Sequence, residues 1–152
     1  MIRLLIEKQK RLLTVYDDRQ ALLCVPVALG REPTGHKMRE GDGRTPEGCY
    51  YICLKRAQGK FGCALGISYP SLSDARRAVR DGRISADLLP LFEAAEKAQK
   101  RPPWGTPLGG EIYIHGGGDQ ADWTAGCIAL SDENMARLFT LCREGDRVEI
   151  TP

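Results

Sequence analysis

One stretch of the sequence places a histidine and a cysteine where the two could carry out acyl transfer. His115 ends an apolar segment, and Cys127 follows at the end of the next, glycine-rich stretch. A cysteine is a strong nucleophile only as its thiolate, and the pKa of a free thiol is about 8.5. A nearby imidazole can accept the thiol proton and later return a proton to a leaving group. The pair therefore favours nucleophilic attack on an acyl carbon.

The residue before Cys127 suits the oxyanion that such an attack creates. Gly126 has no side chain, so the backbone amide of Cys127 and neighbouring amides can face the developing negative charge. By themselves, however, these residue types fit a structural histidine at a strand end and a buried thiol better than a catalytic pair. The glycines at 116–118 do not indicate a nucleotide site, because no Gly-Lys-Ser/Thr sequence follows them.

Length and composition exclude several other classes of function. The 152 residues suit one globular domain, and 22 Lys and Arg residues against 20 Asp and Glu leave a net charge of +2. This near balance argues against a nucleic-acid-binding surface. No apolar run approaches the roughly 20 residues that a transmembrane helix requires. We therefore expect a single domain over residues 1–152, with no nucleic-acid partner and no transmembrane segment.

The six cysteines and two histidines form no metal-binding pattern. The cysteines are scattered, and no paired Cys-x-x-Cys ligands occur, so we expect no metal ion and no organic cofactor. All cysteines except Cys127 are interpreted as small buried hydrophobic residues, with Cys49 and Cys53 on the same face of a strand. A disulfide among them stays open. His36 lies in a polar, glycine-rich loop and is expected to be exposed.

The pattern of apolar residues predicts a mostly β fold with a helical insertion. Alternating apolar residues indicate strands with one buried face, and the expected strands are 2–6, 12–16, 22–29, 49–55, 112–115 and 148–150. Residues 74–81, with Ser73 as N-cap, and residues 85–100 are predicted as helices within an insertion at about 71–103. A third helix is expected after its N-cap, Ser131.

Three short motifs in the second half of the chain resemble those of a known family. They are Ile114-His115-Gly116, Thr124-Ala125-Gly126-Cys127-Ile128 and the capped acidic segment Ser131-Asp132-Glu133-Asn134. This arrangement is similar to the L,D-transpeptidase catalytic domain, also called the YkuD domain. The likeness extends upstream to Thr45-Pro46-Glu47-Gly48 before the strand at 49–55, and so covers nearly the whole chain.

The resemblance implies a β-sandwich of mixed sheets with the catalytic cysteine in a cleft. Enzymes of this family cut the bond after the third residue, meso-diaminopimelate or lysine, of a peptidoglycan tetrapeptide stem, and they release D-alanine. They then pass the acyl group to an amine or to water. The expected partners are therefore peptidoglycan stem peptides, and a carbapenem is expected to be a covalent inhibitor.

On the matching positions, the resemblance also implies a role for each residue of the motifs. Cys127 would be the nucleophile and His115 the general base, with the backbone carbonyl of Gly116 orienting the imidazole. The amides of Gly126 and Cys127 would form the oxyanion hole. Thr124 matches the hydroxyl position of the motif and is expected to bond within the loop. The expected substrate-binding residues are Tyr113, Trp123 and Thr124.

Several departures from the family pattern leave the reaction open. Ala125 stands where many members have histidine, and Ala129 where many have an arginine thought to meet a substrate carboxylate. The alternative to a transpeptidase is a thiol hydrolase, either an L,D-carboxypeptidase or an amidase that releases wall-attached groups. A non-catalytic wall-binding module is disfavoured, because both His115 and Cys127 are present. Trp123 fits either the wall of the cleft or a cap on the core.

The implied substrate places the protein outside the cytoplasm, in the cell wall or periplasm. The charged N-terminal segment lacks the apolar centre of a signal peptide. We therefore expect a chain trimmed ahead of Met1, with a cytoplasmic protein as the alternative. The basic residues of the insertion are interpreted as a solvated helix face rather than a surface for anionic wall polymer; they are Arg76, Arg77, Arg80 and Arg83.

Overall fold

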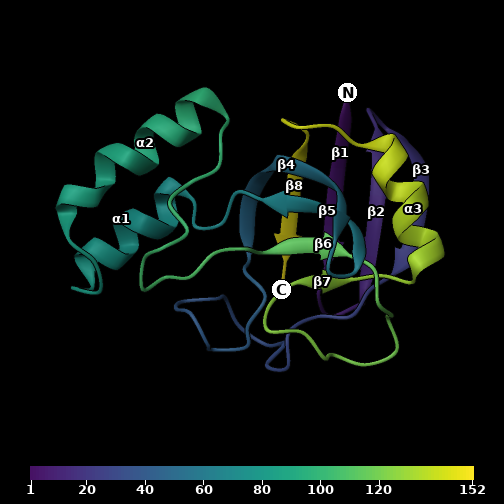
Figure 1. Cartoon of the computed structure of the whole chain (residues 1–152), viewed down its shortest axis with the longest axis horizontal. Helices are drawn as coiled ribbons and strands as arrows, with labels where there is room; N and C mark the ends of the chain where they lie inside the picture. The colour runs from purple at the N-terminus through teal and green to yellow at the C-terminus, as the bar shows by residue number, and fades with distance from the viewer.

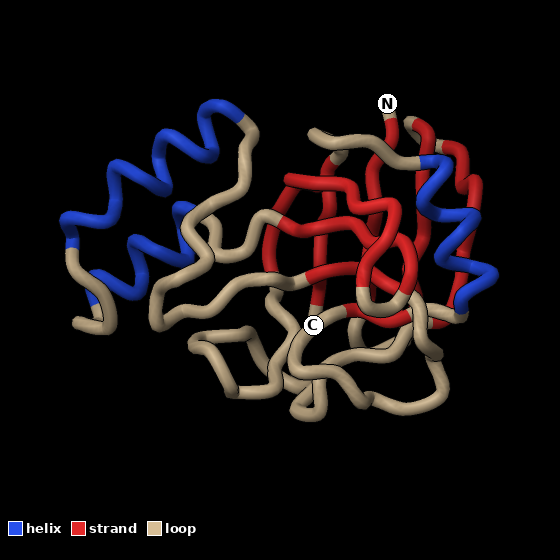
Figure 2. Tube along the Cα trace, in the orientation of Figure 1, coloured by secondary structure: helices blue, strands red, loops and turns tan.

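Eight strands form one mixed sheet that curls around most of the hydrophobic core (Figures 1 and 2). The computed structural model describes all 152 residues. The strand order along the sheet is β3-β2-β1-β8-β4-β5-β6-β7. The strands are β1 (Ile2–Glu7), β2 (Leu12–Asp17), β3 (Gln20–Pro26), β4 (Gly48–Gly59), β5 (Gly62–Ile67), β6 (Tyr113–His115), β7 (Ile128–Ala129) and β8 (Arg147–Thr151).

The alternating side chains of the first strands build the main core. Leu4 and Ile6 of β1 point into a cluster of 22 buried residues, which Val15 of β2 and Ile150 of β8 also join. Strand β1 pairs antiparallel with β2 and parallel with β8, so the two ends of the chain lie in neighbouring strands. Leu5, between Leu4 and Ile6, and Glu149, between Val148 and Ile150, lie on the opposite face of the sheet and outside this cluster, as a period of two requires.

The long strand β4 joins the two halves of the sheet. Its first residues pair with β8 and its later residues with β5, with a shift in register between Ile52 and Leu54. The two edges of the sheet meet where Ala28, just beyond β3, bridges Ala129 of β7. A second bridge joins Gly30 to Thr124. These bridges hold the loop before β7 against the N-terminal half of the sheet.

Three α-helices complete the fold, and two of them form a separate lobe beside the sheet (Figure 1). α1 (Leu72–Arg80) and α2 (Leu89–Ala98) are joined through the 3₁₀ helix η1 (Ala86–Leu88). The lobe has its own small core, formed by Leu72, Ala75, Ala78, Ile84, Phe92 and Leu108. α3 (Asp132–Leu141) packs on the other side of the molecule, where it contacts β5 and β6. None of the helices has both the length and the apolar character needed to cross a bilayer.

The fold class predicted from the sequence is confirmed: the chain is mostly β, with a helical insertion and one helix after Cys127. A single curled sheet supplies both layers of the expected sandwich, because β4 belongs to both of its halves. The sequence does not predict β5, since the glycines at both its start and its interior interrupt the apolar pattern.

The first helix begins earlier than the sequence predicts. Ser71, not Ser73, is the N-cap of α1: its hydroxyl accepts a hydrogen bond from the amide of Asp74 at 3.0 Å. In return, the carboxylate of Asp74 accepts one from the amide of Ser71 at 2.9 Å. This reciprocal capping box satisfies two amides that would otherwise lack partners, which favours the earlier start.

The prediction for the cysteines is partly wrong. All six thiols are free, and Cys53 and Cys142 are buried as expected, but Cys24 and Cys49 are exposed. Tyr50 and Ile52 of β4 join the main core whereas Cys49 and Cys53 do not, so the alternation between these positions is kept and the two cysteines differ in exposure.

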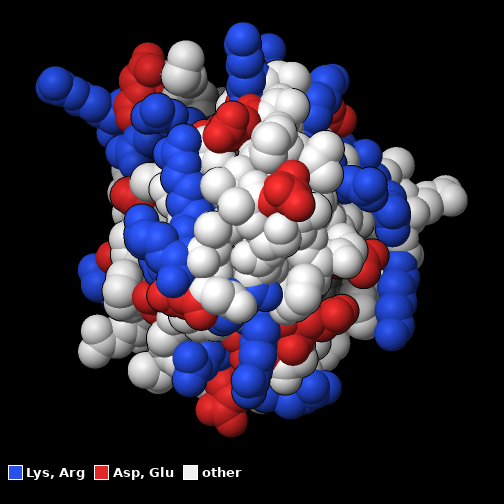
Figure 3. Space-filling model, turned by 90° about the vertical axis from the view of Figure 1, so that its left-hand side faces the viewer, with Lys and Arg blue, Asp and Glu red and all other residues white.

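The basic residues of the helical lobe also divide into two kinds. Arg76, Arg77 and Arg80 are exposed as expected. Arg83 is not a solvated side chain, because its guanidinium donates to the carbonyl of Met38 at 2.6 Å. Figure 3 shows this side of the molecule, where acidic side chains lie among the basic ones.

Candidate active site

The parallel pairing of β6 with β7 brings the two reactive residues of the sequence together. Ile114 pairs with Ile128 and His115 with Ala129, so Cys127 lies beside Tyr113 at the start of β6, two positions before His115. Both side chains line one cleft of about 290 Å³. The residues that line it are Arg56, Gly59, Lys60, Phe61, Gly62, Ala64, Glu111, Tyr113, His115 and Cys127.

The imidazole of His115 is held in one orientation. Its Nδ1 donates to the carbonyl oxygen of Gly116 at 2.5 Å. Phe61, from the turn between β4 and β5, stacks on the ring with centroids 4.6 Å apart, and Trp123 meets the ring edge-on at 5.7 Å. Only Nδ1 has a hydrogen-bond partner, so Nε2 is the nitrogen that is free to take a proton.

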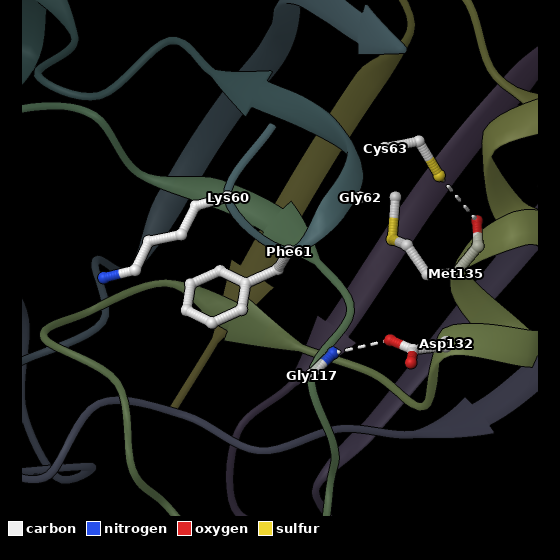
Figure 4. Close-up of a pocket in the computed structure, with 7 residues that line it drawn as sticks. All are labelled: Lys60, Phe61, Gly62, Cys63, Gly117, Asp132 and Met135. Atoms are coloured by element: carbon white, nitrogen blue, oxygen red, sulfur yellow. Dashed lines mark hydrogen bonds between the residues drawn. The ribbon is translucent and has the colours of Figure 1, made fainter. Parts of the chain in front are cut away.

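A second hollow, shown in Figure 4, lies next to the cleft and shares Lys60, Phe61 and Gly62 with it. In this hollow the amide of Gly117 donates to Oδ1 of Asp132 at 2.9 Å, which ties the loop after His115 to the start of α3. Gly117 has a φ of +106°, a conformation that favours glycine. The chain on the C-terminal side of His115 is thus fixed by a side chain of the capped acidic segment.

Backbone groups surround the sulfur of Cys127. Its Sγ lies 3.4 Å from the amide nitrogen of Tyr113, which donates to it, and 3.5 Å from the carbonyl oxygen of Glu111, to which the thiol donates. The residues immediately before and at the start of β6 therefore form the wall behind the thiol. When the thiol loses its proton, the amide of Tyr113 remains as a donor to the thiolate.

Burial determines the protonation states of the pair. It lowers the pKa of His115, and the contact with the carbonyl of Gly116 opposes this shift. Burial also raises the pKa of the Cys127 thiol, whereas the amide of Tyr113 and the charge of Lys37 act in the other direction. Both shifts favour the neutral imidazole and the neutral thiol.

The loop before Cys127 is fixed by its own hydrogen bonds. The hydroxyl of Thr124 donates to the carbonyl of Cys127 at 2.7 Å and accepts from the amide of Gly126 at 3.1 Å. Gly126 has a φ of +142°, and a Cβ at this position would lie 2.7 Å from the carbonyl oxygen of Arg44. Only glycine fits this close approach, which seats the loop against the segment before β4.

These contacts change two of the expected assignments. The hydroxyl of Thr124 is buried and fully used inside the loop, as the motif suggested, so Thr124 does not face the cleft as a substrate-binding residue. The amide of Gly126 is engaged with Thr124 and is not available to an oxyanion. The amide of Cys127 has no hydrogen-bond partner in the protein and stays available.

The expected aromatic residues take different positions around the site. Tyr113 lines the cleft, and its ring meets Trp104 edge-on at 5.6 Å. Trp123 packs against Phe61 and His115, and its indole donates to the carbonyl of Gly118 at 3.0 Å. Trp123 therefore supports the imidazole and is not among the residues that line the cleft.

The wall that the hairpin of β4 and β5 contributes to the cleft is not predicted from the sequence. Arg56, Lys60 and Phe61 lie far from the motifs along the chain, and no spacing connects them to His115 or Cys127. The only available signal was a polar stretch between two apolar segments, which indicates a turn but not what the turn covers.

His36 lies away from the cleft, and the expectation that it is exposed is wrong. Its side chain is 15% exposed, with Nε2 2.9 Å from Oδ1 of Asp74. The amide of Glu47 donates to Nδ1 at 2.8 Å. Tyr50 also donates to Asp74, at 2.9 Å, so a carboxylate on α1 draws the loop histidine inward. Across the whole structure, no three His, Cys, Asp or Glu side chains are grouped so that they could hold a metal ion.

Comparison with protein families agrees with the motifs and with this geometry. The model of the L,D-transpeptidase catalytic domain matches residues 2–150. The chain belongs to the YkuD family. A comparison with curated protein sequences gives no significant match.

Solved structures resemble this YkuD domain over its whole length. The helical cell shape determining protein Pgp2 from Campylobacter jejuni is 22% identical with a TM-score of 0.67, and the match covers 98% of this chain and 46% of that one. An L,D-transpeptidase from Mycobacterium smegmatis is 15% identical with a TM-score of 0.58, covering 99% and 58%. LdtMt1 in complex with imipenem is 16% identical with a TM-score of 0.56, also covering 99% and 58%. The chain thus spans about half the length of these proteins, and at these identities the likeness shows the fold.

Proposed function

We propose that this YkuD domain is an L,D-transpeptidase that cleaves the bond after the third residue of a peptidoglycan tetrapeptide stem and transfers the acyl group to an amine. Membership of the family supports the class of reaction. The observation that carries the proposal is the shared cleft, in which Cys127 accompanies a histidine whose Nδ1 is fixed on Gly116 and whose Nε2 has no partner.

In the first half of the reaction, His115 acts as the general base. Nε2 takes the proton of the Cys127 thiol, and the thiolate attacks the carbonyl carbon of the third stem residue. The oxyanion that forms accepts a hydrogen bond from the amide of Cys127. When the intermediate collapses, the peptide C–N bond breaks, His115 returns the proton to the leaving amine, and D-alanine departs from a thioester on Cys127.

In the second half, an acceptor amine replaces the leaving group. The amine attacks the thioester carbon and transfers a proton to Nε2 of His115, and the C–S bond then breaks. The Cys127 thiolate leaves and regains its proton from the imidazole. Neither half requires a metal ion or an oxidant, because only proton and acyl transfers take place.

Water is the alternative acceptor, and one feature of the site favours it. Ala125, where many family members carry a histidine, is exposed beside the cysteine and leaves that side of the thioester open to solvent. Hydrolysis would make the chain an L,D-carboxypeptidase, or an amidase if the leaving amine belongs to a wall-attached group. In either case Cys127 and His115 keep the same roles.

Mass spectrometry of the products separates these outcomes. The protein is incubated with a tetrapeptide-stem muropeptide, with and without an added amine. A cross-linked or amine-bearing product indicates transfer, whereas a tripeptide stem in both reactions indicates hydrolysis. If the folded protein gives neither product and behaves like Cys127→Ala, the proposal is wrong and a non-catalytic wall-binding module takes its place.

A carbapenem should label the same thiol. The structure of LdtMt1 in complex with imipenem shows that a fold of this kind can accommodate the drug. We expect a single covalent adduct on the wild-type protein and none on Cys127→Ala, as measured by intact mass. An adduct that persists in Cys127→Ala would show that another residue is the one that reacts.

Because peptidoglycan lies outside the cytoplasm, we also propose that the protein is located in the cell wall or periplasm, which fractionation of cells can check.

A further inference from the structure

Two basic side chains line the cleft without an acidic partner. Arg56 lies on β4 and Lys60 in the turn that follows, and neither forms an ion pair. Glu111 is the only acidic residue among those that line the cleft. The wall around the thiol therefore carries an excess of positive charge that nothing within the protein neutralises.

Each of these cations is held over an aromatic ring next to one of the reactive residues. The guanidinium carbon of Arg56 lies 5.5 Å from the centroid of Tyr113, whose amide contacts Sγ of Cys127. The ammonium of Lys60 lies 5.4 Å from the centroid of Phe61, which stacks on His115. Figure 4 shows Lys60 extending away from Asp132, on the other side of Phe61. These cation–π contacts place the two charges over rings that adjoin the thiol and the imidazole.

The position that supplies an arginine in many family members cannot do so here. Ala129 is fully buried between the bridge to Ala28 and the pairing with His115, and it brings no charge to the cleft. Arg56 is the only guanidinium that lines the cleft. Its planar fork can bind a carboxylate through two parallel hydrogen bonds, which an ammonium cannot do.

We propose that Arg56, assisted by Lys60, recognises a free carboxylate on the acyl-donor peptide and so selects acidic stem peptides for attack by Cys127. The inference rests on the proposed function and assigns the substrate contact that the motif lacks at position 129. Two sources could supply the carboxylate: the C-terminus of the leaving residue, or the side chain of the third residue. Both lie within one residue of the bond that breaks.

Three stem peptides distinguish these sources. One has diaminopimelate at the third position and a free C-terminus, the second carries a C-terminal amide, and the third has lysine in place of diaminopimelate. Arg56→Gln should raise KM for the first peptide about tenfold, while Arg56→Lys recovers part of the loss. On the peptide that lacks the recognised carboxylate, Arg56→Gln should have no further effect. Arg76→Gln, the same charge change on α1, is the matched control and should leave KM unchanged.

The inference is overturned if Arg56→Gln leaves KM unchanged for all three peptides, or raises it by the same factor for all three. If the wild-type protein processes none of them, the proposed function fails instead. A second measurement keeps the two failures apart, because it needs no peptide. Iodoacetate is an anion and iodoacetamide is neutral, and both alkylate the thiolate.

The alkylation rates of Cys127 by iodoacetate and by iodoacetamide are measured by mass spectrometry of the peptide that contains Cys127. The ratio of the two rates reports the positive charge beside the thiol. Arg56→Gln should lower the ratio of iodoacetate to iodoacetamide about threefold. Arg56→Lys and Arg76→Gln should preserve it. An unchanged ratio in Arg56→Gln would show that the guanidinium does not act at the thiol, whatever substrate the protein uses.

Discussion

The two histidines of the chain are both largely shielded from solvent, yet their ring nitrogens are used in different ways. At His36 both nitrogens are engaged, with Nε2 on the carboxylate of Asp74 and Nδ1 accepting from the amide of Glu47. At His115 only Nδ1 has a partner, the carbonyl of Gly116. The first ring joins a loop to the helical lobe, and the second stands beside a thiol in a cleft.

Burial alone therefore does not decide what a histidine does. An imidazole with two bonded nitrogens can exchange a proton only by giving up a contact, so it serves as a fixed link. An imidazole with one bonded nitrogen keeps its orientation and still has an atom that can accept a proton. The comparison predicts that changes at the cleft alter chemistry, whereas changes around His36 alter stability.

The largest effect should come from Cys127→Ala. Removal of the sulfur eliminates the only thiol in the cleft, so no thioester can form and product should fall to the background of the uncatalysed reaction. The unfolding temperature should stay close to that of the wild type, because the thiol lies in the cleft and outside the main core. Cys49→Ala, which removes an exposed thiol, is the control. Loss of turnover in that folded control would contradict the assignment.

His115→Ala should lower the rate of acylation by a factor on the order of 10²–10⁴ at neutral pH, the usual contribution of a positioned base. Part of the activity should return at alkaline pH, where hydroxide forms the thiolate without help. The rate of alkylation of Cys127 by iodoacetamide, measured against pH, tests this directly. Identical profiles for the wild type and His115→Ala would show that His115 is structural.

The wild-type pH profile sharpens the same point. Because burial lowers the pKa of His115, the imidazole stays neutral at pH values where an ordinary histidine would be protonated. We expect the acidic limb of the acylation rate to lie below pH 6.5, the ordinary value for histidine. An acidic limb above pH 6.5 would instead require an imidazole stabilised in its charged form.

His36→Ala should destabilise the protein without changing the chemistry. It removes a partner from the buried carboxylate of Asp74, and a buried polar group left without its partner costs about 1–3 kcal/mol of unfolding free energy. Burial acts to raise the pKa of Asp74, but hydrogen bonds from His36 and Ser71 more than offset it, so the pKa lies below its usual value. The stability that this carboxylate contributes should therefore be present at neutral pH and be lost as the pH falls below about 4.

Thermal unfolding measures this effect, and alkylation of Cys127 provides the contrast. The melting temperature of His36→Ala should fall by several degrees, while the alkylation rate of the folded protein stays at the wild-type value. If His36→Ala kept the wild-type melting temperature but slowed the alkylation of Cys127, His36 would act in the chemistry and not in stability, which would contradict the comparison.

The smallest effect separates two neighbouring serines of the helical lobe. Ser71→Ala should lower the unfolding free energy by about 1 kcal/mol, because the hydroxyl caps α1 within the contacts around Asp74. Ser73→Ala, within the first turn of the same helix, should change it very little, since its side chain is exposed. Urea unfolding measures the free energy of unfolding of both variants. Equal decreases in the two variants would show that Ser71 is not the residue that caps α1.

Local sequence was sufficient to predict most of the strands and helices and to recognise the motifs that contain His115 and Cys127. Alternation of apolar residues predicts the strands around the core, and Ser131 before its acidic residues predicts the start of α3, because side chains and amides a few positions apart decide both. His115 and Cys127 could be singled out as a candidate pair only through the motifs around them, which resemble those of the YkuD family, because the two residue types by themselves fit a structural role better.

What surrounds that pair was decided only by the tertiary structure. The curl of the sheet brings the hairpin of β4 and β5 over β6, which places Phe61 on His115 and Arg56 beside Tyr113. The carboxylate of Asp74 likewise draws His36 out of solvent from 38 positions away. Such contacts depend on strand pairing between distant segments, and residue types close together in the chain carry no information about it.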